Sequence, residues 1–372
     1  MKDQSTISRR SFLKATAGLA GGSLVAHRPP PAMAAIGGNL NMIGWEGYDL
    51  PDAAKPFQAK HGITLNVTYI GSNDEVLTKF QAGGPGRYDV GNITSRFIQP
   101  MIEQKMLTPL DEARLPNFKQ VYPQFQNVDW ARRDGKLYAV PAYFGFDVIN
   151  YNADFIKQPP KTWDVLIDPQ YKGKVGFYDN PSGTMFFIGA IVGVGADGTK
   201  YTKTDLQKII EWGKKWKANS KTLVKSYGEM TDLLVRGDIW LGAIGWQYVT
   251  VQGQKQRANL ADALPDGPAK AWCDSYFIFT GTTNLDTAYA WIDNAITSEV
   301  MAKSGPALNS MVTNAKAMPL LPQEHAKLMG YDKLNDQLGR AVFSVFPPAR
   351  AADPNHISLD ELLRGYEQIK AS

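Results

Sequence analysis

Leu40-Asn41-Met42-Ile43-Gly44-Trp45 and the alternating segment Ile63-Thr64-Leu65-Asn66-Val67-Thr68-Tyr69 frame the pattern that decides the fold. The first is a short apolar run that ends at a glycine, which is typical of a buried strand. The second places an apolar side chain at every other position, which is typical of a strand with one buried face. Between them, residues 51–61 have a helical pattern that Gly62 is expected to end. The order predicts a strand–helix–strand unit.

The same alternation continues along the chain. Further helices are expected to begin at residues 72–75 and to run over residues 205–217, and further strands at residues 88–90 and 174–178. A capping box at Ser358 and Glu361 predicts the last helix. Strands and helices that alternate in this way predict an α/β fold with a mostly parallel, doubly wound sheet.

Residues 1–34 are expected to be an export signal. Ser8-Arg9-Arg10-Ser11-Phe12-Leu13-Lys14 precedes an apolar run from Ala15 to Ala26, which is short of the about 20 residues that span a bilayer as a helix. Paired arginines before such a run predict a twin-arginine signal, and Ala32-Met33-Ala34 is a small-x-small cleavage site. We therefore expect export to the periplasm in the folded state; an ordinary secretory signal is the alternative.

The positive charge of the chain belongs to this leader. The sequence has 40 Lys and Arg against 36 Asp and Glu. Residues 1–34 account for five of the bases and one of the acids, which leaves 35 of each. A neutral mature chain argues against a nucleic-acid partner. Its 338 residues predict two lobes rather than one core, and its single cysteine, Cys273, excludes an internal disulfide.

Residues typical of catalysis or metal binding do not gather in the sequence. His27, His61, His325 and His356 lie far apart and have no ligand-like neighbours. The pattern G-x-G-x-x-G occurs at residues 193–198 but follows a predicted helix, whereas a dinucleotide site requires a preceding strand. We expect no enzyme activity, no metal and no cofactor. A periplasmic enzyme exported with a bound cofactor is the alternative that the leader alone suggests.

Aromatic side chains occur where strands are expected to end. Trp45 and Tyr48 follow the first strand, and Trp246 follows the apolar run 241–244. Open α/β sheets bind ligands at the carboxyl ends of their strands. The position of these rings therefore favours a ligand site over simple core filling.

A further strand is expected to open with Trp272-Cys273-Asp274. Alternation along an extended chain places Trp272 and Asp274 on one face and turns Cys273 inward, as a buried and inert thiol. An aromatic face beside a carboxylate recognises an alkylammonium ion through cation–π attraction and a charge-assisted hydrogen bond.

Several segments together resemble the extracellular solute-binding proteins of ABC importers, of the spermidine/putrescine-binding type. They are residues 45–48 (WEGY), 88–90 (YDV), 94–97 (TSRF), 137–143 (LYAVPAY), 168–175 (DPQYKGKV), 236–238 (RGD) and 272–275 (WCDS). The resemblance covers nearly the whole mature chain. It implies a two-lobed periplasmic-binding-protein fold in which each lobe is a mixed sheet flanked by helices, with a hinge between the lobes.

The resemblance also implies how the chain is divided and how it works. Lobe 1 is expected to comprise residues 38–142 plus 273–314, and lobe 2 residues 143–272 plus 315–372. The lobes would close over a ligand held in the cleft between them.

The resemblance assigns ligand-binding roles in the first lobe. Trp45 and Tyr48 match aromatic walls of the site. Ser95 and Phe97 match a Ser-x-Tyr pair, although Phe97 lacks the hydroxyl group.

Other positions match further binding residues of the family. Trp272 and Asp274 match a Trp-x-Asp motif that, in polyamine binders, stacks on the chain and pairs with an amine. Trp246 matches another aromatic residue, but an extra residue, Gly245, leaves its register open.

The second lobe departs from the polyamine pattern. Only Asp179 is acidic near the start of its expected helix, where the family places acids for further amines. Ser182-Gly183-Thr184 could instead offer backbone N–H groups and hydroxyls to an anionic group, and Arg96 is a candidate partner for a carboxylate. One cationic end and a neutral or anionic other end would suit this set.

The expected function is that of a monomeric periplasmic binding protein that captures a small amine-bearing solute and delivers it to an ABC permease. A polyamine or a related cationic compound is the leading ligand. Thiamine, an amino-acid derivative or an anion is the alternative; iron would call for paired tyrosines, and the sequence has no adjacent Tyr-Tyr.

Overall fold

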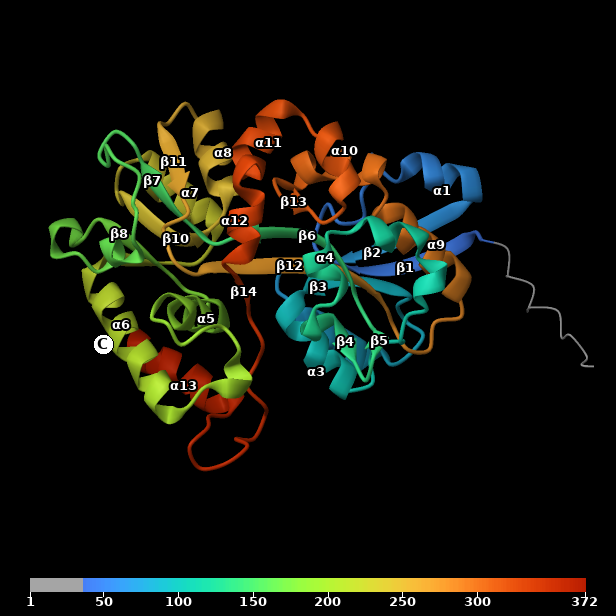
Figure 1. Ribbon diagram of the computed structural model, residues 1–372, viewed down its shortest axis with the longest axis horizontal. Coiled ribbons are helices and arrows are strands. Elements are labelled where there is room, and N and C mark those ends of the chain that lie inside the picture. Colours follow the sequence, from blue (N-terminus) through green and yellow to red (C-terminus); the bar gives the residue numbers. More distant parts are fainter. Residues whose placement is uncertain (1–35) are drawn as a thin grey trace, which may run out of the picture. The chain divides into compact units, whose positions relative to one another are not determined.

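The computed structural model describes residues 36–372, and within this range the strands form a seven-stranded sheet, a five-stranded sheet and a small two-stranded ribbon (Figure 1). The predicted export signal lies outside the described residues. No helix in the described range is long and apolar enough to cross a membrane.

The first sheet has the strand order β13–β6–β12–β3–β1–β2, with β14 also paired to β12. Its strands are β1 (Gly38–Gly44), β2 (Ile63–Tyr69), β3 (Val90–Thr94), β6 (Val140–Phe146), β12 (Ala269–Ile278), β13 (Met311–Val312) and β14 (Ala341–Phe343). Strand β1 is parallel to both β2 and β3, whereas β12 is antiparallel to β3 and β6.

The second sheet has the order β11–β7–β10–β8–β9. Its strands are β7 (Val148–Asn152), β8 (Val175–Tyr178), β9 (Ser220–Val224), β10 (Leu241–Gly245) and β11 (Leu260–Ala263). Strands β8, β9 and β10 are parallel, and β7 is antiparallel to β10 and β11. Strands β4 (Arg132–Arg133) and β5 (Lys136–Leu137) form the ribbon.

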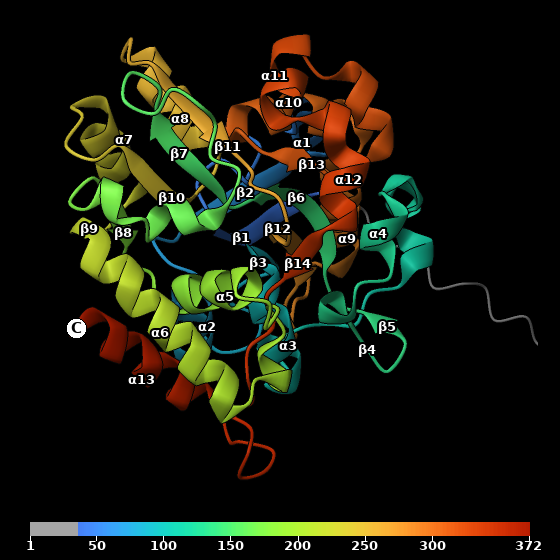
Figure 2. The same ribbon diagram turned by 60° about the vertical axis from the view of Figure 1, so that its left-hand side comes forward.

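Helices cover both sheets. Those that pack with the first sheet are α1 (Lys55–His61), α2 (Asp74–Gly83), α3 (Ile98–Glu103), α4 (Pro123–Gln126), α9 (Leu285–Ala295), α10 (Ser298–Leu308), α11 (Gln323–Met329) and α12 (Leu334–Gly339). Those that pack with the second are α5 (Pro181–Ile191), α6 (Lys203–Asn219), α7 (Tyr227–Val235), α8 (Gln247–Lys255) and α13 (Leu359–Lys370). Figure 2 shows α5, α6 and α13 side by side.

The predicted strand–helix–strand unit is confirmed. Strands β1 and β2 pair in register from Gly38↔Ile63 to Gly44↔Tyr69, with α1 between them in sequence. Gly62 ends α1 in the left-handed conformation, at φ 62°, which a glycine adopts without steric cost. The predicted capping box at Ser358 and Glu361 is also present at the start of α13.

The prediction of mostly parallel sheets is wrong, and the mixed sheets implied by the family resemblance are confirmed. Parallel pairs occur between strands that are connected through helices, such as β1 with β3 and β8 with β10. Strands β6, β7 and β12 form the antiparallel pairs. The chain passes from one sheet to the other through these strands. Only one residue, Asp147, separates β6 from β7.

Buried apolar side chains form two cores, one under each sheet. The first includes side chains from residues 40–146 and 269–338, and the second from residues 149–260 and 357–369. The first core thus takes in residues 317–338, which the expected division assigned to lobe 2, because α11 and α12 pack on the first sheet. We keep the division into two lobes as a proposal, with residues 315–338 in lobe 1.

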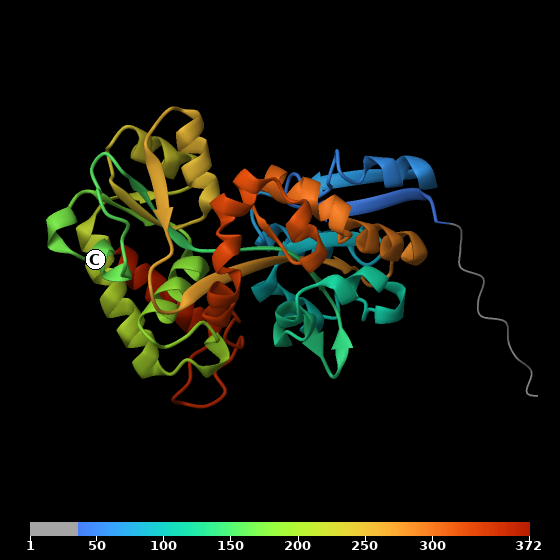
Figure 3. The same cartoon turned by 45° about the horizontal axis from the view of Figure 1, so that its top comes forward.

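A buried ion pair holds the two crossing segments together. Figures 1 and 3 show β6 and β12 running side by side between the two groups of helices. Where they cross, the Lys270 ammonium lies 3.5 Å from the Asp147 carboxylate, and the Asp147 N–H donates to the Lys270 carbonyl at 2.8 Å. Both side chains are buried. Burial raises the pKa of Asp147 and lowers that of Lys270, while each partner counteracts the shift of the other.

Removing one partner of this pair is expected to destabilise the protein. Lys270→Met leaves the Asp147 carboxylate buried without its cation, which should lower the free energy of unfolding by about 3–5 kcal/mol. Asp147→Asn combined with Lys270→Met should recover most of that loss, because no unpaired charge is left. Urea denaturation followed by circular dichroism measures both variants.

The matched control is Lys200→Met, which removes an exposed ion pair with Asp197 and should leave the midpoint unchanged. If Lys270→Met unfolds at the same urea concentration as the wild type, the buried pair contributes nothing to the stability of the protein.

Candidate ligand-binding site

The predicted site residues of the first sheet lie at the carboxyl ends of its parallel strands. Trp45 follows β1 directly, and Ser95 follows β3. Strand β12 runs antiparallel beside β3, and Asp274 pairs with Thr94, the last residue of β3. The start of β12 therefore lies at the edge where β1 and β3 end, as expected for a ligand site in an open α/β sheet.

Asp274 is a buried carboxylate without a basic partner. It accepts a 2.5 Å hydrogen bond from the hydroxyl of Tyr48, whose ring packs edge-on against Tyr143. No described Lys, Arg or His forms an ion pair with it. Burial raises the pKa of Asp274 to about 6, although the Tyr48 hydroxyl and the nearby Arg96 favour the charged form.

Trp272 lies on the same face of β12 as Asp274. Its indole covers Gly145 of β6 so closely that a Cβ at Gly145 would lie 2.5 Å from the ring. The intervening Cys273 is fully buried, which confirms the predicted alternation. Burial raises the pKa of the Cys273 thiol well above its ordinary value, so it stays protonated and unreactive.

Three aromatic residues extend this surface onto the second sheet. Tyr178 ends β8, Tyr227 begins α7 a short turn after β9, and Trp246 follows β10. Their rings contact in series, with centroids 4.9 Å apart for Tyr178–Tyr227 and 4.5 Å for Tyr227–Trp246. Trp246 and Trp272 follow at 6.0 Å. We call Tyr178, Tyr227, Trp246 and Trp272 the aromatic row; it joins the carboxyl ends of both sheets.

A bulge in β10 precedes Trp246, and the indole of Trp246 bonds to a residue of the first lobe. The register of β10 against β7 shifts between Gly242 and Gly245, and Ile244 has φ 62°, a strained value for a β-branched residue. The bulge absorbs the extra Gly245 noticed in the sequence. The indole N–H of Trp246 then donates to the carbonyl of Asn309, at the end of α10, at 3.1 Å.

Trp45 is half-buried and anchored at the edge of the site. Its indole N–H donates to the side-chain oxygen of Asn73 at 3.3 Å, and the same oxygen accepts from the N–H of Thr94. Asn73 thereby ties the segment after β1 to the end of β3.

Ser95 and Phe97 belong to a 3₁₀ turn, Ser95–Phe97, and both are buried. The ring of Phe97 packs edge-on against Phe346 at 5.0 Å. Phe346 lies on the segment between α12 and α13, which connects the first core with the second. These contacts make Phe97 part of the packing beside that segment, and its role in ligand binding stays a prediction.

Asp179, which is expected to bind the ligand, has partners within the chain, and its role in binding stays a prediction. Its carboxylate accepts from the hydroxyl of Tyr366 at 2.5 Å and from the ammonium of Lys370 at 3.0 Å, both on α13. Burial raises the pKa of Asp179, but these two partners outweigh it and lower the pKa overall. A carboxylate paired in this way does not need a ligand ammonium.

Residues that the sequence analysis missed also line this region. Tyr178 and Tyr227 follow the same rule as Trp246, since they lie where β8 and β9 end, and a systematic use of that rule would have found them. Tyr143 lies inside β6, and no signal in the sequence marks its contact with Tyr48.

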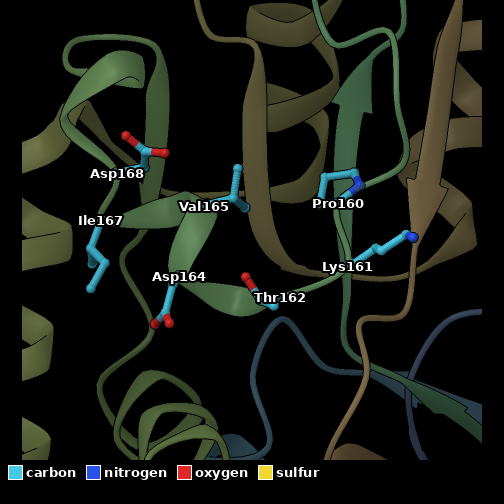
Figure 4. A pocket seen from close by; sticks show the side chains of 7 residues that line it. All are labelled: Pro160, Lys161, Thr162, Asp164, Val165, Ile167 and Asp168. Atoms are coloured by element: carbon cyan, nitrogen blue, oxygen red, sulfur yellow. The ribbon is translucent and has the colours of Figure 1, made fainter.

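Two cavities lie away from the predicted residues. One of about 510 Å³ borders the 3₁₀ turn Trp163–Leu166, and Figure 4 shows Lys161 and Asp164 pointing away from each other there. Another, of about 910 Å³, borders α3 and residues 343–349. None of the eight predicted site residues lines either cavity. Within the described range, no group of three His, Cys, Asp or Glu could hold a metal ion.

Comparison with known families settles the class of the protein. Residues 52–324 match the family described as bacterial extracellular solute-binding protein. The chain belongs to this family. Its members bind a small solute and work with an ABC transporter, so the prediction that this solute-binding protein is not an enzyme is confirmed.

Two curated relatives are similar to this solute-binding protein along most of its length. A putrescine/cadaverine-binding protein of Pseudomonas aeruginosa is 26% identical over 309 residues, 79% of this chain and 84% of the relative. A putrescine-binding periplasmic protein of Escherichia coli is 24% identical over 327 residues, 82% and 86% of the two chains.

Solved structures confirm the two-lobed periplasmic-binding-protein fold. A spermidine/putrescine ABC transporter substrate-binding protein from Streptococcus pneumoniae has a TM-score of 0.76 at 21% identity and covers 90% of this chain and 98% of its own. A GABA receptor has a TM-score of 0.66 at 19% identity, with 89% and 95% covered.

Gly145 is expected to be required for the position of Trp272. In Gly145→Ala the new methyl group would lie where the indole now lies, so the ring must move and the Trp246–Trp272 contact must change. We expect an altered near-ultraviolet circular dichroism spectrum and affinity for the native solute weakened by about tenfold, since a displaced Trp272 would lose its cation–π attraction for the amine that the sequence predicts as ligand.

Gly339→Ala is the matched control, because a Cβ at Gly339 meets no atom within 4 Å. Gly145→Ala with the wild-type spectrum and affinity would mean that Trp272 is not held by this contact.

Proposed function

We propose that this solute-binding protein captures a small solute that carries an ammonium group and delivers it to an ABC permease from the periplasm. The observation that carries the proposal is the Asp274 carboxylate, which is buried beside the carboxyl end of β3, accepts a hydrogen bond from Tyr48 and forms no ion pair with any described basic side chain. An ammonium ion would form the ion pair that Asp274 lacks and would donate to its remaining oxygen lone pairs.

The aromatic row supports the same ligand class. Trp272 lies on the face of β12 that carries Asp274, and its π face attracts a cation by about 0.5–2 kcal/mol. The names of the curated relatives, which bind putrescine or cadaverine, point to amines as well. A polyamine needs an acid for its second ammonium group, however, and Asp179 is already paired with Lys370.

The contacts between the sheets suggest how binding is signalled. Trp246 of the second sheet contacts both Trp272 and the end of α10. A solute bound between Asp274 and the aromatic row would strengthen these contacts and raise the population of the closed form that a permease recognises. We further propose that the protein acts as a monomer and is exported folded by the twin-arginine route.

The aromatic row also supports a second class of ligand, a flat aromatic cation. Four rings in series suit a flat cation such as thiamine, whose ring could replace the edge-on contacts by stacking. An amino-acid derivative also fits one acidic partner and one aromatic wall.

The direct test of ligand class is mass spectrometry of small molecules released from the protein after purification from its own periplasm. An amine at one equivalent per chain is the expected result. A stoichiometric compound without any basic nitrogen would contradict the proposal.

Asp274 is expected to be the strongest single determinant of affinity. Asp274→Asn keeps the shape and a hydrogen bond to Tyr48 but removes the charge, so amine affinity should fall about 10²–10³-fold by calorimetry. Asp293→Asn is the matched control, since Asp293 lies on α9, outside the site, and accepts its hydrogen bonds from Asn117. Near-normal affinity of Asp274→Asn would remove Asp274 from the site.

The affinity for an amine is expected to depend on pH through Asp274. Its pKa in the free protein is raised to about 6, and the cation binds the ionised form. Affinity should therefore be full above pH 7 and about tenfold weaker at pH 5, with proton release on binding near pH 6. Calorimetry in buffers of different ionisation enthalpy measures both effects, and Asp274→Asn should abolish them. A flat profile in the wild type would contradict this role.

A further inference from the structure

Arg96 is a cation at the site for which the structure provides no hydrogen-bonding partner. It occupies the middle of the turn Ser95–Phe97, directly after β3 and beside the start of β12. Its Nε atom is buried and makes no hydrogen bond, and none of its nitrogens forms an ion pair with a described residue. The guanidinium group lies 5.2 Å from the ring of Phe97.

The two buried acids near Arg96, Asp147 and Asp274, already accept hydrogen bonds from other residues. Tyr227, Asp147, Asp274 and the exposed Asp74 are the groups close enough to interact with it electrostatically. Asp147 is paired with Lys270, and Asp274 accepts from Tyr48. Arg96 as a whole is only partly buried, but its buried Nε–H group has no acceptor. A buried donor without an acceptor is costly, which indicates that a ligand completes the coordination of the guanidinium group.

The charge balance of the site favours a ligand without net charge. Arg96 and Lys270 contribute two positive charges and Asp147 and Asp274 two negative charges, so the four groups sum to zero. A diamine would add two positive charges close to Arg96. A zwitterion leaves the sum at zero and gives each unmatched group, Asp274 and Arg96, an opposite charge.

The other candidate for an anion is already occupied. At the start of α5, the N–H of Gly183 donates to the side chain of Asn180 at 2.9 Å, and the N–H of Thr184 donates to the carbonyl of Asn180. The hydroxyl of Thr184 donates to the carbonyl of Tyr178. Asn180 thus caps the helix, and the expected anion site at residues 182–184 is largely used by the chain itself.

We propose that the solute is zwitterionic, with its ammonium group on Asp274 and a carboxylate on the guanidinium of Arg96, beside the hydroxyl of Tyr227. The proposal rests on the proposed function and specifies its substrate class. It makes this protein a binder of amino acids whose amino and carboxylate groups are separated by a chain, rather than a binder of diamines.

A panel of compounds of matched length tests this on the wild-type protein by calorimetry. The probes are 4-aminobutanoate, 1,4-diaminobutane and butylamine, together with the corresponding five-carbon set. We expect the amino acid of the better-fitting length to bind about tenfold or more tightly than the diamine and the alkylamine of the same length, because only the amino acid meets both charges.

Arg96→Gln then separates the two ends of the ligand. It should reduce affinity for the amino acid about tenfold or more, to the level of the alkylamine, and leave alkylamine affinity unchanged or higher. Arg96→Lys should retain part of the amino-acid preference. Arg87→Gln, an exposed arginine of the same lobe, is the matched control, and the wild-type panel decides the question if an Arg96 variant does not fold.

The outcomes separate this inference from the proposed function. Tightest binding of the diamine, or an unchanged amino-acid affinity in Arg96→Gln, would overturn the zwitterion inference while leaving an amine ligand on Asp274 intact. Failure of every compound to bind the wild type would overturn both.

Discussion

The pairing of β12 with both β3 and β6 is the constraint on which the site depends. Strand pairing holds the middle of β12 on both sides, with Asp274 beside Thr94 at the end of β3 and Trp272 beside Gly145 of β6. Because side chains alternate along a strand, Trp272 and Asp274 then lie on the same face of the sheet. Because β6 and β12 also connect the two sheets, the same pairing positions the acid and the aromatic ring at the junction between the lobes.

Around this junction lie four charged side chains, of which three are buried and Arg96 is partly buried, and two of the four have no ionic partner. Asp147 and Lys270 neutralise each other where the strands cross. Asp274 has a hydroxyl partner but no cation, and Arg96 has no partner that forms a hydrogen bond or an ion pair with it. Unmatched buried charges are expensive in a folded protein. Such groups gather at functional sites, and here they lie beside the aromatic row.

Much of the fold could be predicted because it depends on local signals. The β1–α1–β2 unit follows from spacing and from Gly62. The prediction that residues 193–198 follow a helix is confirmed, since α5 ends at Ile191 and Gly193 has φ 78°. The antiparallel entry of β6 and β12 could not be predicted, because it arises from the connection between two sheets. It depends on contacts between strands more than 120 residues apart in the sequence.

The candidate site could likewise be predicted where it depends on local signals. Trp272, Asp274, Trp246 and Tyr48 lie together because strand ends and alternation are local properties. The state of Asp179 was not predictable, since its partners Tyr366 and Lys370 come from the last helix. The packing of Phe97 on Phe346 is likewise a contact between distant segments. Which acid is free and which is paired is decided by tertiary structure alone.

A crystal structure of the protein with the solute that co-purifies from its periplasm tests the central claim most directly. The account predicts a ligand nitrogen within hydrogen-bonding distance of the Asp274 carboxylate, with the ligand chain against Trp272. A ligand bound elsewhere, or one that presents an oxygen or a carbon atom to Asp274, would contradict it.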